Sequence, residues 1–478
     1  MKEGLSGGLL NVLAEAECQR IHAASLDILA NHGVLCDSPA LLRLFADGGA
    51  LVDEDTRLVR LPGDLVNWAL RAAPKSFTLY ARDPALDLAL EQPRAYFGLG
   101  GSAVPYFWDF EKRALRDPVK ADVVAATRLG HALPNVDFVM SLAAAGDAPE
   151  RLHYLHEYHA ILGNTTKPVI YSAPSRRYAA AFLEMAAAAS GGEGELRARP
   201  SVMLFTQPVS PLQIGPYNEG MIDFAALGVP ILFSPGAMMG ATSPATIAGS
   251  LVQGNAENLA GIALSQLLRP GTPIVYGPHT PVMDMATTRC TYAGTEQALG
   301  RAAMARLARF YGLPSFNTGA GCDAWEVDAQ AAAEATMGIF LNALSGLTLT
   351  QTMGTMASGT FGSLEMLVVC DEVVAMARRV LRGVAVSEDS LAVDVIKEVG
   401  PGGHYLDHEH TVRAFRREFF FPGLFARSSL AAWQEEGGEG RLLRRAHARV
   451  VDTLERRATP VPLAAQRDLD ACLRRLTA

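Results

Sequence analysis

From Ala95 onward the chain alternates short apolar runs with longer alanine-rich segments of helical spacing. About eight runs are rich in branched or aromatic residues, and nearly every one ends in Gly, Ser, Gln, Asn or Pro. They lie near Ala95–Gly100, Val136–Ala143, Pro168–Ser172, Val202–Gln207, Pro230–Ser234, Pro273–Tyr276, Pro314–Asn317 and Leu347–Thr352. This alternation is typical of βα units, and eight of them predict an α/β fold, a (β/α)8 barrel of the TIM type. A doubly wound open sheet is the alternative, but no Gly-x-Gly-x-x-Gly opens a helix to support it.

The barrel is predicted to carry a helical extension at each end. Residues 1–94 show helical apolar spacing, for example from Leu41 to Phe45, and should form an N-terminal helical extension packed on the barrel. Residues 95–383 are assigned to the barrel itself, and residues 384–478 to a C-terminal helical extension. Within the latter, Arg413–Phe421 mixes basic and aromatic residues, and Arg441–Arg457 predicts a helix with a basic face. A solvated face is the default interpretation, and a docking surface is the alternative.

Composition narrows the class of protein. With 49% hydrophobic and 19% charged residues, the 478-residue chain can bury a large core. Its 42 Lys and Arg against 50 Asp and Glu leave it mildly acidic, which argues against nucleic acid as a partner. The N-terminus lacks the basic and then apolar pattern of a signal peptide, and the longer apolar runs are interrupted. We therefore expect a cytoplasmic protein that does not bind a membrane.

The six cysteines are dispersed and form no Cys-x-x-Cys motif. No paired histidines lie beside them, so the sequence encodes no local zinc site, and we expect no metal.

In a (β/α)8 barrel the working face is built from the loops at the carboxyl ends of the strands. The polar side chains expected there include Gln207, His279, Asn317 and Gln351. The ring of strand-end residues is poor in lysine, so no Schiff-base lysine or phosphate clamp stands out. A structural role stays open for each of these residues, because strand-end groups often only satisfy main-chain atoms. The most chemically mixed loop lies within Leu313–Gln330, where a polar structural turn is the alternative interpretation.

Several motifs then carry a family resemblance. They are Leu133–Ser141, Gly240–Gly249, Asn255–Glu257, Asp328–Gln330, Leu364–Glu372, Arg378–Gly383 and Glu398–Leu406. In this order they resemble the trimethylamine methyltransferase family, from the N-terminal helices to about Pro422. The resemblance implies a barrel that transfers a methyl group from a methylated amine to cobalt(I) of a separate, cognate corrinoid protein. The corrinoid (cobalamin) would thus be carried by the partner, with no cofactor tightly bound to this chain. A homo-oligomer is also expected.

The same resemblance separates two branches of the family. Some members carry pyrrolysine in the region that resembles Phe316–Asp323, where this chain has an ordinary sequence. The chain resembles the non-pyrrolysine branch, whose characterised members demethylate quaternary amines such as glycine betaine. A homologue acting on another methylated substrate and a non-catalytic barrel that binds a quaternary amine are the alternatives. A lyase or isomerase would need a base or a lysine at the strand ends.

Quaternary amine chemistry suggests which residues form the site. A quaternary ammonium group departs as a neutral amine without a general acid, so the protein must supply aromatic faces for the cation and polar groups for any carboxylate. The substrate-binding candidates are Phe97, Tyr106, Trp108, Gln207, Tyr276, His279, Asn317, Trp325 and Phe361. Core packing is the alternative for the aromatic residues.

The expected catalytic residues are Asp323, Glu365 and Gln351. Both acids follow glycine-containing loops, although Asp323 could make a turn and Glu365 could occupy the first turn of a helix. If Asp323 meets the substrate, Asp323→Ala should reduce methyl transfer at a stability cost of no more than about 1 kcal/mol.

Overall fold

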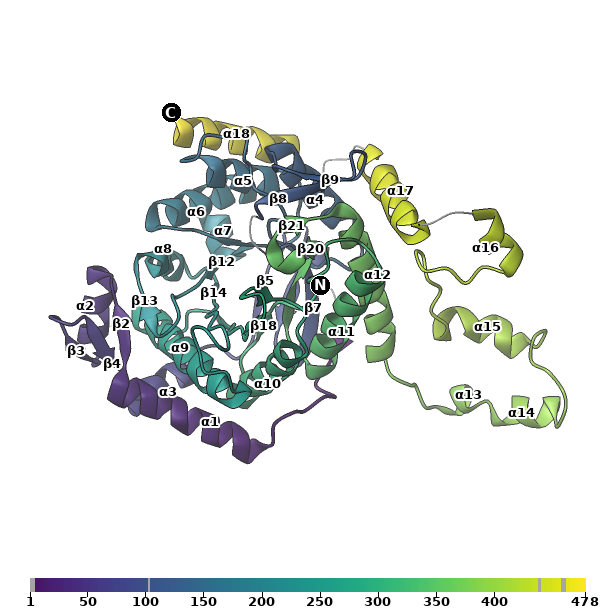
Figure 1. The fold of residues 1–478 in the computed structure, drawn as a ribbon, viewed down its shortest axis with the longest axis horizontal. Helices are drawn as coiled ribbons and strands as arrows, with labels where there is room; N and C mark the ends of the chain where they lie inside the picture. The colour runs from purple at the N-terminus through teal and green to yellow at the C-terminus, as the bar shows by residue number, and fades with distance from the viewer. Residues whose placement is uncertain (1–4, 102–103, 437–439, 457–460) are drawn as a thin grey trace.

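Eight parallel strands form a closed barrel in the computed structural model, which describes residues 5–101, 104–436, 440–456 and 461–478 (Figure 1). The strands are β7 (Arg94–Leu99), β10 (Phe138–Val139), β11 (Val169–Ser172), β12 (Val202–Thr206), β14 (Ile231–Phe233), β15 (Ile274–Tyr276), β18 (Phe316–Asn317) and β19 (Leu349–Met353). They pair in the order β15-β14-β12-β11-β10-β7-β19-β18, and a parallel bridge between Tyr276 and Ser315 joins the two ends. The predicted (β/α)8 fold is confirmed, and each of the eight predicted runs contains one strand.

Helices follow the strands and cover the outside of the barrel (Figure 1). They are α4 (Lys120–Ala132), α5 (His153–Leu162), α6 (Arg176–Ser190), α7 (Glu193–Ala198), α8 (Gly220–Leu227), α9 (Ile247–Leu268), α10 (Thr295–Tyr311), α11 (Ala329–Ser345) and α12 (Leu364–Leu381). Local sequence sets several of their ends. Asp328 caps α11 by accepting the N–H of Ala331 at 3.0 Å, and Ser363 caps α12 by accepting that of Met366 at 3.2 Å. Gly312, with φ of 68°, ends α10 in the left-handed conformation that favours glycine.

Alternate residues of the strands point inward and fill the barrel. The buried interior cluster contains Tyr96, Phe138, Met140, Ile170, Met203, Phe205, Leu232, Val275, Phe316 and Leu349. Space is tight at Gly98, where a Cβ atom would lie 2.1 Å from the ring of Phe138. The interior is therefore a packed core and not a channel.

A hairpin closes the amino end of the barrel. It consists of β5 (Phe77–Leu79) and β6 (Leu88–Leu90), and its leucines belong to the same buried cluster as the barrel interior. Just after β5, the N–H of Tyr80 donates to the carbonyl of Pro200 at 3.0 Å, which precedes β12. The hairpin thus caps the end opposite the one where active sites of this fold lie.

The N-terminal part packs on one side of the barrel (Figure 1). It comprises α1 (Glu15–Asp27), β2 (Val34–Cys36), α2 (Pro39–Asp47), β3 (Leu51–Asp53), β4 (Leu58–Arg60) and α3 (Gly63–Ala72). Its helices lie against α9, and β2 pairs in parallel with β13 (Gln213–Ile214), which belongs to the segment after β12.

We call the carboxyl end of the barrel strands the mouth. A small sheet lies beside it. It has the order β20-β21-β8-β9. Strands β8 (Tyr106–Asp109) and β9 (Ala114–Arg116) follow β7, whereas β20 (Thr355–Met356) and β21 (Phe361–Gly362) follow β19. Two loops from neighbouring barrel strands therefore build one wall beside the mouth.

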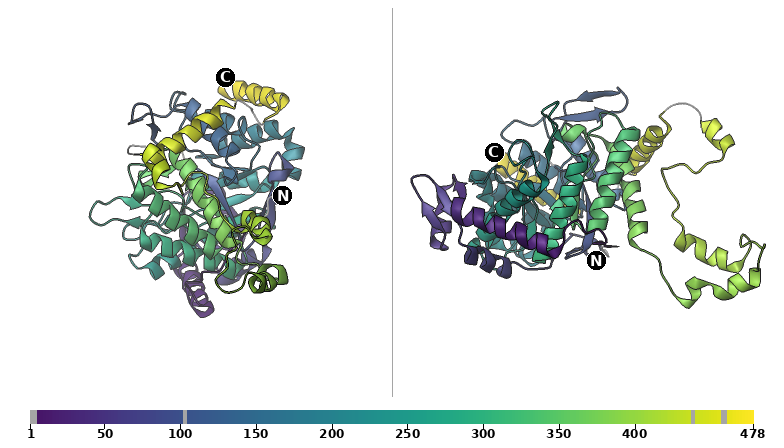
Figure 2. Two further views of the ribbon diagram at one scale, coloured as in Figure 1. Left: turned by 90° about the vertical axis from the view of Figure 1, so that its right-hand side faces the viewer. Right: turned by 60° about the horizontal axis from the view of Figure 1, so that its bottom comes forward.

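The chain beyond α12 leaves the barrel and then returns to it (Figures 1 and 2). Residues 384–436, which we call the arm, contain α13 (Glu388–Leu391), α14 (Val393–Val399), α15 (Glu409–Glu418) and α16 (Leu430–Glu436). Helix α17 (Arg441–Glu455) packs on α12 and α4, and α18 (Leu463–Thr477) packs on α5 and α6. Throughout the described part of the chain, no helix has the length and apolar character needed to cross a membrane.

Candidate active site at the mouth of the barrel

Three rings form the floor of the mouth. Phe205 and Phe316 are inward-facing residues near the carboxyl ends of β12 and β18, and their ring centroids lie 5.8 Å apart. The imidazole of His279 stands edge-on to Phe316, also at 5.8 Å. Sequence reasoning did not single out Phe205 or Phe316, although strand alternation places Phe205 on the same face as the predicted Gln207. Phe205 and His279 are 6% exposed and Phe316 is 1% exposed, so these rings form the upper layer of the packed interior beneath the mouth.

His279 is a neutral imidazole held by Asn317. Its Nδ1 lies 2.9 Å from Oδ1 of Asn317, whose Nδ2 donates to the carbonyl of Pro278 at 2.8 Å. Because that amide oxygen accepts, Nδ1 of His279 carries the proton and Nε2 keeps its lone pair. Burial lowers the pKa of His279 to about 4; the bond to Asn317 opposes this shift, and the charge of Arg301 adds to it. At neutral pH His279 cannot act as a general acid.

The two predicted glutamines add neutral amides at the strand ends. Gln351, near the end of β19, is buried, and its Oε1 has no hydrogen-bond partner among the described residues. This oxygen lies close to the strand-end backbone, because a Cβ atom on Gly101 would come within 3.1 Å of it. Gln207 follows β12, and its side chain is exposed. Four polar candidates thus lie at the mouth, and none carries a charge at neutral pH.

Thr352 holds the loop after β18 in place. Its φ of 81° is unusual for a β-branched residue and marks strain of the kind found at functional sites. Its Oγ1 accepts the N–H groups of Gly319, Ala320 and Gly321 at 3.2, 3.1 and 2.8 Å. The loop is therefore fixed by a neighbouring strand, a contact that the sequence pattern did not indicate.

The carboxylate of Asp323, the first predicted catalytic acid, joins neighbouring loops in the structure. Its carboxylate accepts the N–H of Tyr292 at 2.6 Å, the N–H of Ala293 at 3.0 Å and the hydroxyl of Ser358 at 2.6 Å. The fully buried guanidinium of Arg301 interacts with this carboxylate electrostatically and donates to the carbonyl of Tyr292 at 3.1 Å. The oxygens of Asp323 are thus occupied by the segments after β15 and β19.

Glu365, the second predicted catalytic acid, links two helices in the structure. It lies buried in the first turn of α12, where its Oε2 accepts from Ser363 at 3.0 Å. Its Oε1 lies 2.9 Å from Nδ1 of His447 on α17, and the His447 ring stacks on Phe110 with centroids 3.5 Å apart. Glu365 therefore ties the C-terminal helices to the barrel.

Three of the predicted aromatic residues meet beside the mouth. Phe361 lies 6.5 Å from Trp108 and 6.1 Å from Trp325 between ring centroids. These rings line a cavity of about 380 Å³ together with Arg113, Glu326, Val327, Met356 and Leu443. The guanidinium of Arg289 lies 5.3 Å from the centroid of the Trp325 ring, so this ring already faces a cation. Tyr106 pairs with Phe361 across the sheet and is 43% exposed.

The remaining two aromatic predictions are corrected by strand alternation. Val275 points into the barrel, so Tyr276 points outward, where its hydroxyl donates to Oδ1 of Asn255 at 2.8 Å. Likewise Tyr96 points inward, and Phe97 packs into the outer core beneath the helices. Neither Tyr276 nor Phe97 reaches the mouth.

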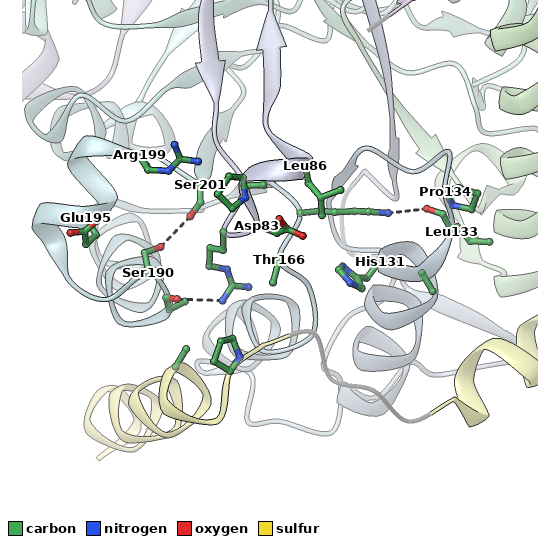
Figure 3. A pocket seen from close by; sticks show the side chains of 18 residues that line it. Asp83, Leu86, His131, Leu133, Pro134, Thr166, Ser190, Glu195, Arg199 and Ser201 are labelled. Atoms are coloured by element: carbon green, nitrogen blue, oxygen red, sulfur yellow. Dashed lines mark hydrogen bonds between the residues drawn. The ribbon is translucent and has the colours of Figure 1, made fainter. Parts of the chain in front are cut away.

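A cavity of about 950 Å³ lies beside the starts of β11 and β12 (Figure 3). Two of its cationic lining groups bind main-chain carbonyls: Nη2 of Arg82 donates to Leu162 at 2.6 Å, and Nζ of Lys167 donates to Gly130 at 2.7 Å. Burial and these two cations lower the pKa of His131 in the same lining to about 4. These groups fasten segments at the amino end, away from the mouth.

No cluster of three or more His, Cys, Asp or Glu side chains that could hold a metal ion occurs in the part of the chain that the structure describes. Cys322, the cysteine of the mixed loop, is buried, and burial raises the pKa of its thiol.

Comparisons with known proteins agree over nearly the whole chain. The trimethylamine methyltransferase (MTTB) family matches residues 6–478. Trimethylamine methyltransferase MttB of Desulfitobacterium hafniense (strain DSM 10664 / DCB-2) is 35% identical over 466 residues, which cover 96% of this chain and 91% of that protein. The glycine betaine methyltransferase of Desulfitobacterium hafniense (strain Y51) is 32% identical over 469 residues, covering 97% and 95%.

A solved structure shares the fold. The Methanosarcina barkeri monomethylamine methyltransferase (MtmB) matches with a TM-score of 0.50 over 95% of this chain and 96% of that one, at 12% identity. The family match spans nearly the whole chain, and full-length relatives are more than 30% identical to it. The chain therefore belongs to the trimethylamine methyltransferase family and is a methyltransferase.

Proposed function

We propose that this enzyme moves a methyl group from a quaternary amine of the glycine betaine type to cobalt(I) of a corrinoid carried by a partner protein. The observation that supports this most is the neutral mouth. Among the described residues there, His279 is uncharged at neutral pH, and Gln207, Asn317 and Gln351 are amides. The two nearby acids, Asp323 and Glu365, are engaged in structural hydrogen bonds.

A neutral mouth suits one class of methyl donor. A tertiary amine leaves as an amide anion unless its nitrogen is first protonated, and none of the four polar candidates described at the mouth is an acid at neutral pH. A quaternary ammonium needs no proton: the methyl carbon forms a bond to cobalt(I), the C–N bond breaks, and its electron pair stays on nitrogen as a neutral amine departs. The corrinoid supplies the nucleophile, and this chain binds and orients the donor.

The floor rings give the cation its place in this proposal. The faces of Phe205 and Phe316 attract an ammonium group through their quadrupoles, and Nε2 of His279 presents a lone pair and no second proton. The side-chain N–H groups of Gln207 and Gln351 are suited to donate to the carboxylate of a betaine.

The cavity of Trp108, Trp325 and Phe361 is a second candidate for the same substrate. Its aromatic lining suits an ammonium group, and Arg113 in the same lining suits a carboxylate. Because Trp325 is half exposed, it can be replaced without opening the core.

Transfer is tested with the purified chain and its reduced corrinoid protein. The cobalt(I) absorbance should decay on addition of glycine betaine and persist with trimethylamine. Rapid decay with trimethylamine contradicts the proposal. Tight betaine binding by calorimetry without decay supports instead a barrel that binds a quaternary amine and does no chemistry.

Two substitutions decide between the floor and the neighbouring cavity. Gln351→Ala should raise KM for betaine about tenfold if the substrate lies on the floor, whereas Trp325→Ala should do so if it lies in the cavity. Tyr276→Phe is the matched control, because its hydroxyl faces Asn255 in the helical layer, and its KM should stay unchanged.

A further inference from the structure

The arm, residues 384–436, exposes apolar side chains to an unusual degree. None of its four helices contains a buried residue. Of the 25 large hydrophobic side chains that the described residues expose, 12 lie in this ninth of the chain. They are Val384, Val386, Leu391, Val393, Ile396, Tyr405, Leu406, Val412, Phe419, Phe421, Leu430 and Trp433.

Helix α15 shows why the arm needs another protein surface to pack against. Its apolar residues Val412, Phe415 and Phe419 recur at helical spacing, and Arg413 and Arg416 lie between them. The rings of Phe415 and Phe421 lie 5.9 Å apart between centroids, and both residues belong to the arm. A ten-residue helix is marginal alone in water, so α15 depends on burying this stripe.

The position of the arm indicates that its cover comes from another molecule. It projects from the body of the protein in Figure 1 and in the right-hand view of Figure 2, and both of its ends return to packed helices, α12 and α17. Exposure continues at its base, where Val380 on α12 is 49% exposed and Val384 is 89% exposed. The arm is thus a tethered loop of helices and not a loose tail.

The amount of exposed apolar surface on the arm favours a permanent protein interface over a transient one. Twelve side chains of this size amount to on the order of 1,000 Å² per arm, and two arms reach the range of obligate interfaces. A carrier protein that leaves in every turnover would return this surface to water each time. Obligate apolar interfaces are most often formed between copies of one chain related by a two-fold axis.

We propose that the arm binds a second copy of this chain, so that in a two-fold dimer each arm lies on the body of the other copy. This inference is independent of the proposed substrate. It accounts for an extended arm whose four helices bury no residue, although Leu424 between α15 and α16 is anchored in the core of the body.

Light scattering after size exclusion tests the proposal on the full-length chain at micromolar concentration. The protein is expected to be a dimer or a multiple of dimers, with slow hydrogen exchange at the amides of α15. In the double variant Phe419→Asp and Phe421→Asp, the dimer dissociation constant should rise at least a hundredfold, and the α15 amides should exchange rapidly. Leu51→Asp, at an exposed site on β3, is the matched control and should leave both unchanged.

Three outcomes overturn the proposal. The first is a monomer at micromolar concentration, and the second is a dimer that the double variant leaves intact. The third is protection of the α15 amides only when the corrinoid partner is added, which assigns the arm to that partner. The thermal melting of the variant checks its fold, and the barrel should remain intact because the arm contributes no buried side chain from its helices.

Discussion

Replacing Asp323 by Asn should destabilise the protein and leave the chemistry of each folded molecule largely intact. The carboxylate accepts three hydrogen bonds, at 2.6, 3.0 and 2.6 Å, that join the segments after β15, β18 and β19. Hydrogen bonds to a charged group contribute about 1.5 to 3 kcal/mol each. The side-chain oxygen of Asn can still accept some of these hydrogen bonds, but its NH2 group would face a main-chain N–H and make no hydrogen bond to it. The substitution also removes the negative charge beside the buried guanidinium of Arg301. We expect a net loss of about 3 kcal/mol in the free energy of unfolding.

Urea unfolding followed by circular dichroism measures this loss, and cobalt(I) decay at low temperature measures kcat per folded molecule. Glu326→Gln in the same loop is the matched control, because its exposed side chain should change stability by no more than about 0.5 kcal/mol. Unchanged stability with methyl transfer reduced a hundredfold would show that Asp323 meets the substrate after all, and would refute the bracing role.

Three further results are expected. Because the pKa values of His131 and His279 are lowered to about 4 while an unfolded imidazole titrates near 6.5, the unfolded state binds more protons between these values. The free energy of unfolding should therefore fall by about 3 kcal/mol per histidine as pH drops from 6.5 to 4. Replacing either histidine by Gln should reduce this dependence of the unfolding free energy on pH, and an unchanged dependence would contradict the burial of that histidine. Glu365→Ala should weaken the packing of α17 (Arg441–Glu455), because it removes the contact with His447. Limited proteolysis should then cleave within α17 faster than in the unmodified protein, and an unchanged cleavage pattern would refute this. Elemental analysis of the purified protein should find no stoichiometric zinc, and one tightly bound ion per chain would overturn this.

The fold could be predicted because each barrel strand has a local signature. A run such as Val202–Gln207 is short, branched or aromatic, and ends in a polar residue, and the eight repeats of this signature leave few architectures. The arm could not be predicted in the same way. Its helices Glu409–Glu418 and Leu430–Glu436 have ordinary amphipathic patterns, and nothing local tells whether such a stripe faces its own barrel.

The site was only partly predictable, because contacts between distant residues determine what a side chain faces. His279 and Gln351 could be named from their positions at strand ends. The hydrogen bonds of Asp323 could not be predicted, since its partners Tyr292 and Ser358 come from other loops and no spacing reveals them. Tyr276 ends a strand of only three residues, and because side chains alternate along it, the inward position of Val275 turns Tyr276 outward.

The hairpin of β5 and β6 has a kinetic consequence for the proposed transfer. Because it plugs the amino end of the barrel, the methyl donor and the bulky methyl acceptor share the entrance at the mouth. A docked carrier covers that entrance, so the donor must bind first, and the demethylated amine can escape only after the carrier has withdrawn. Substrate binding then has a compulsory order, with the methyl donor before the carrier protein. A large excess of carrier should slow the reaction, because it binds over the mouth of the enzyme before the donor does.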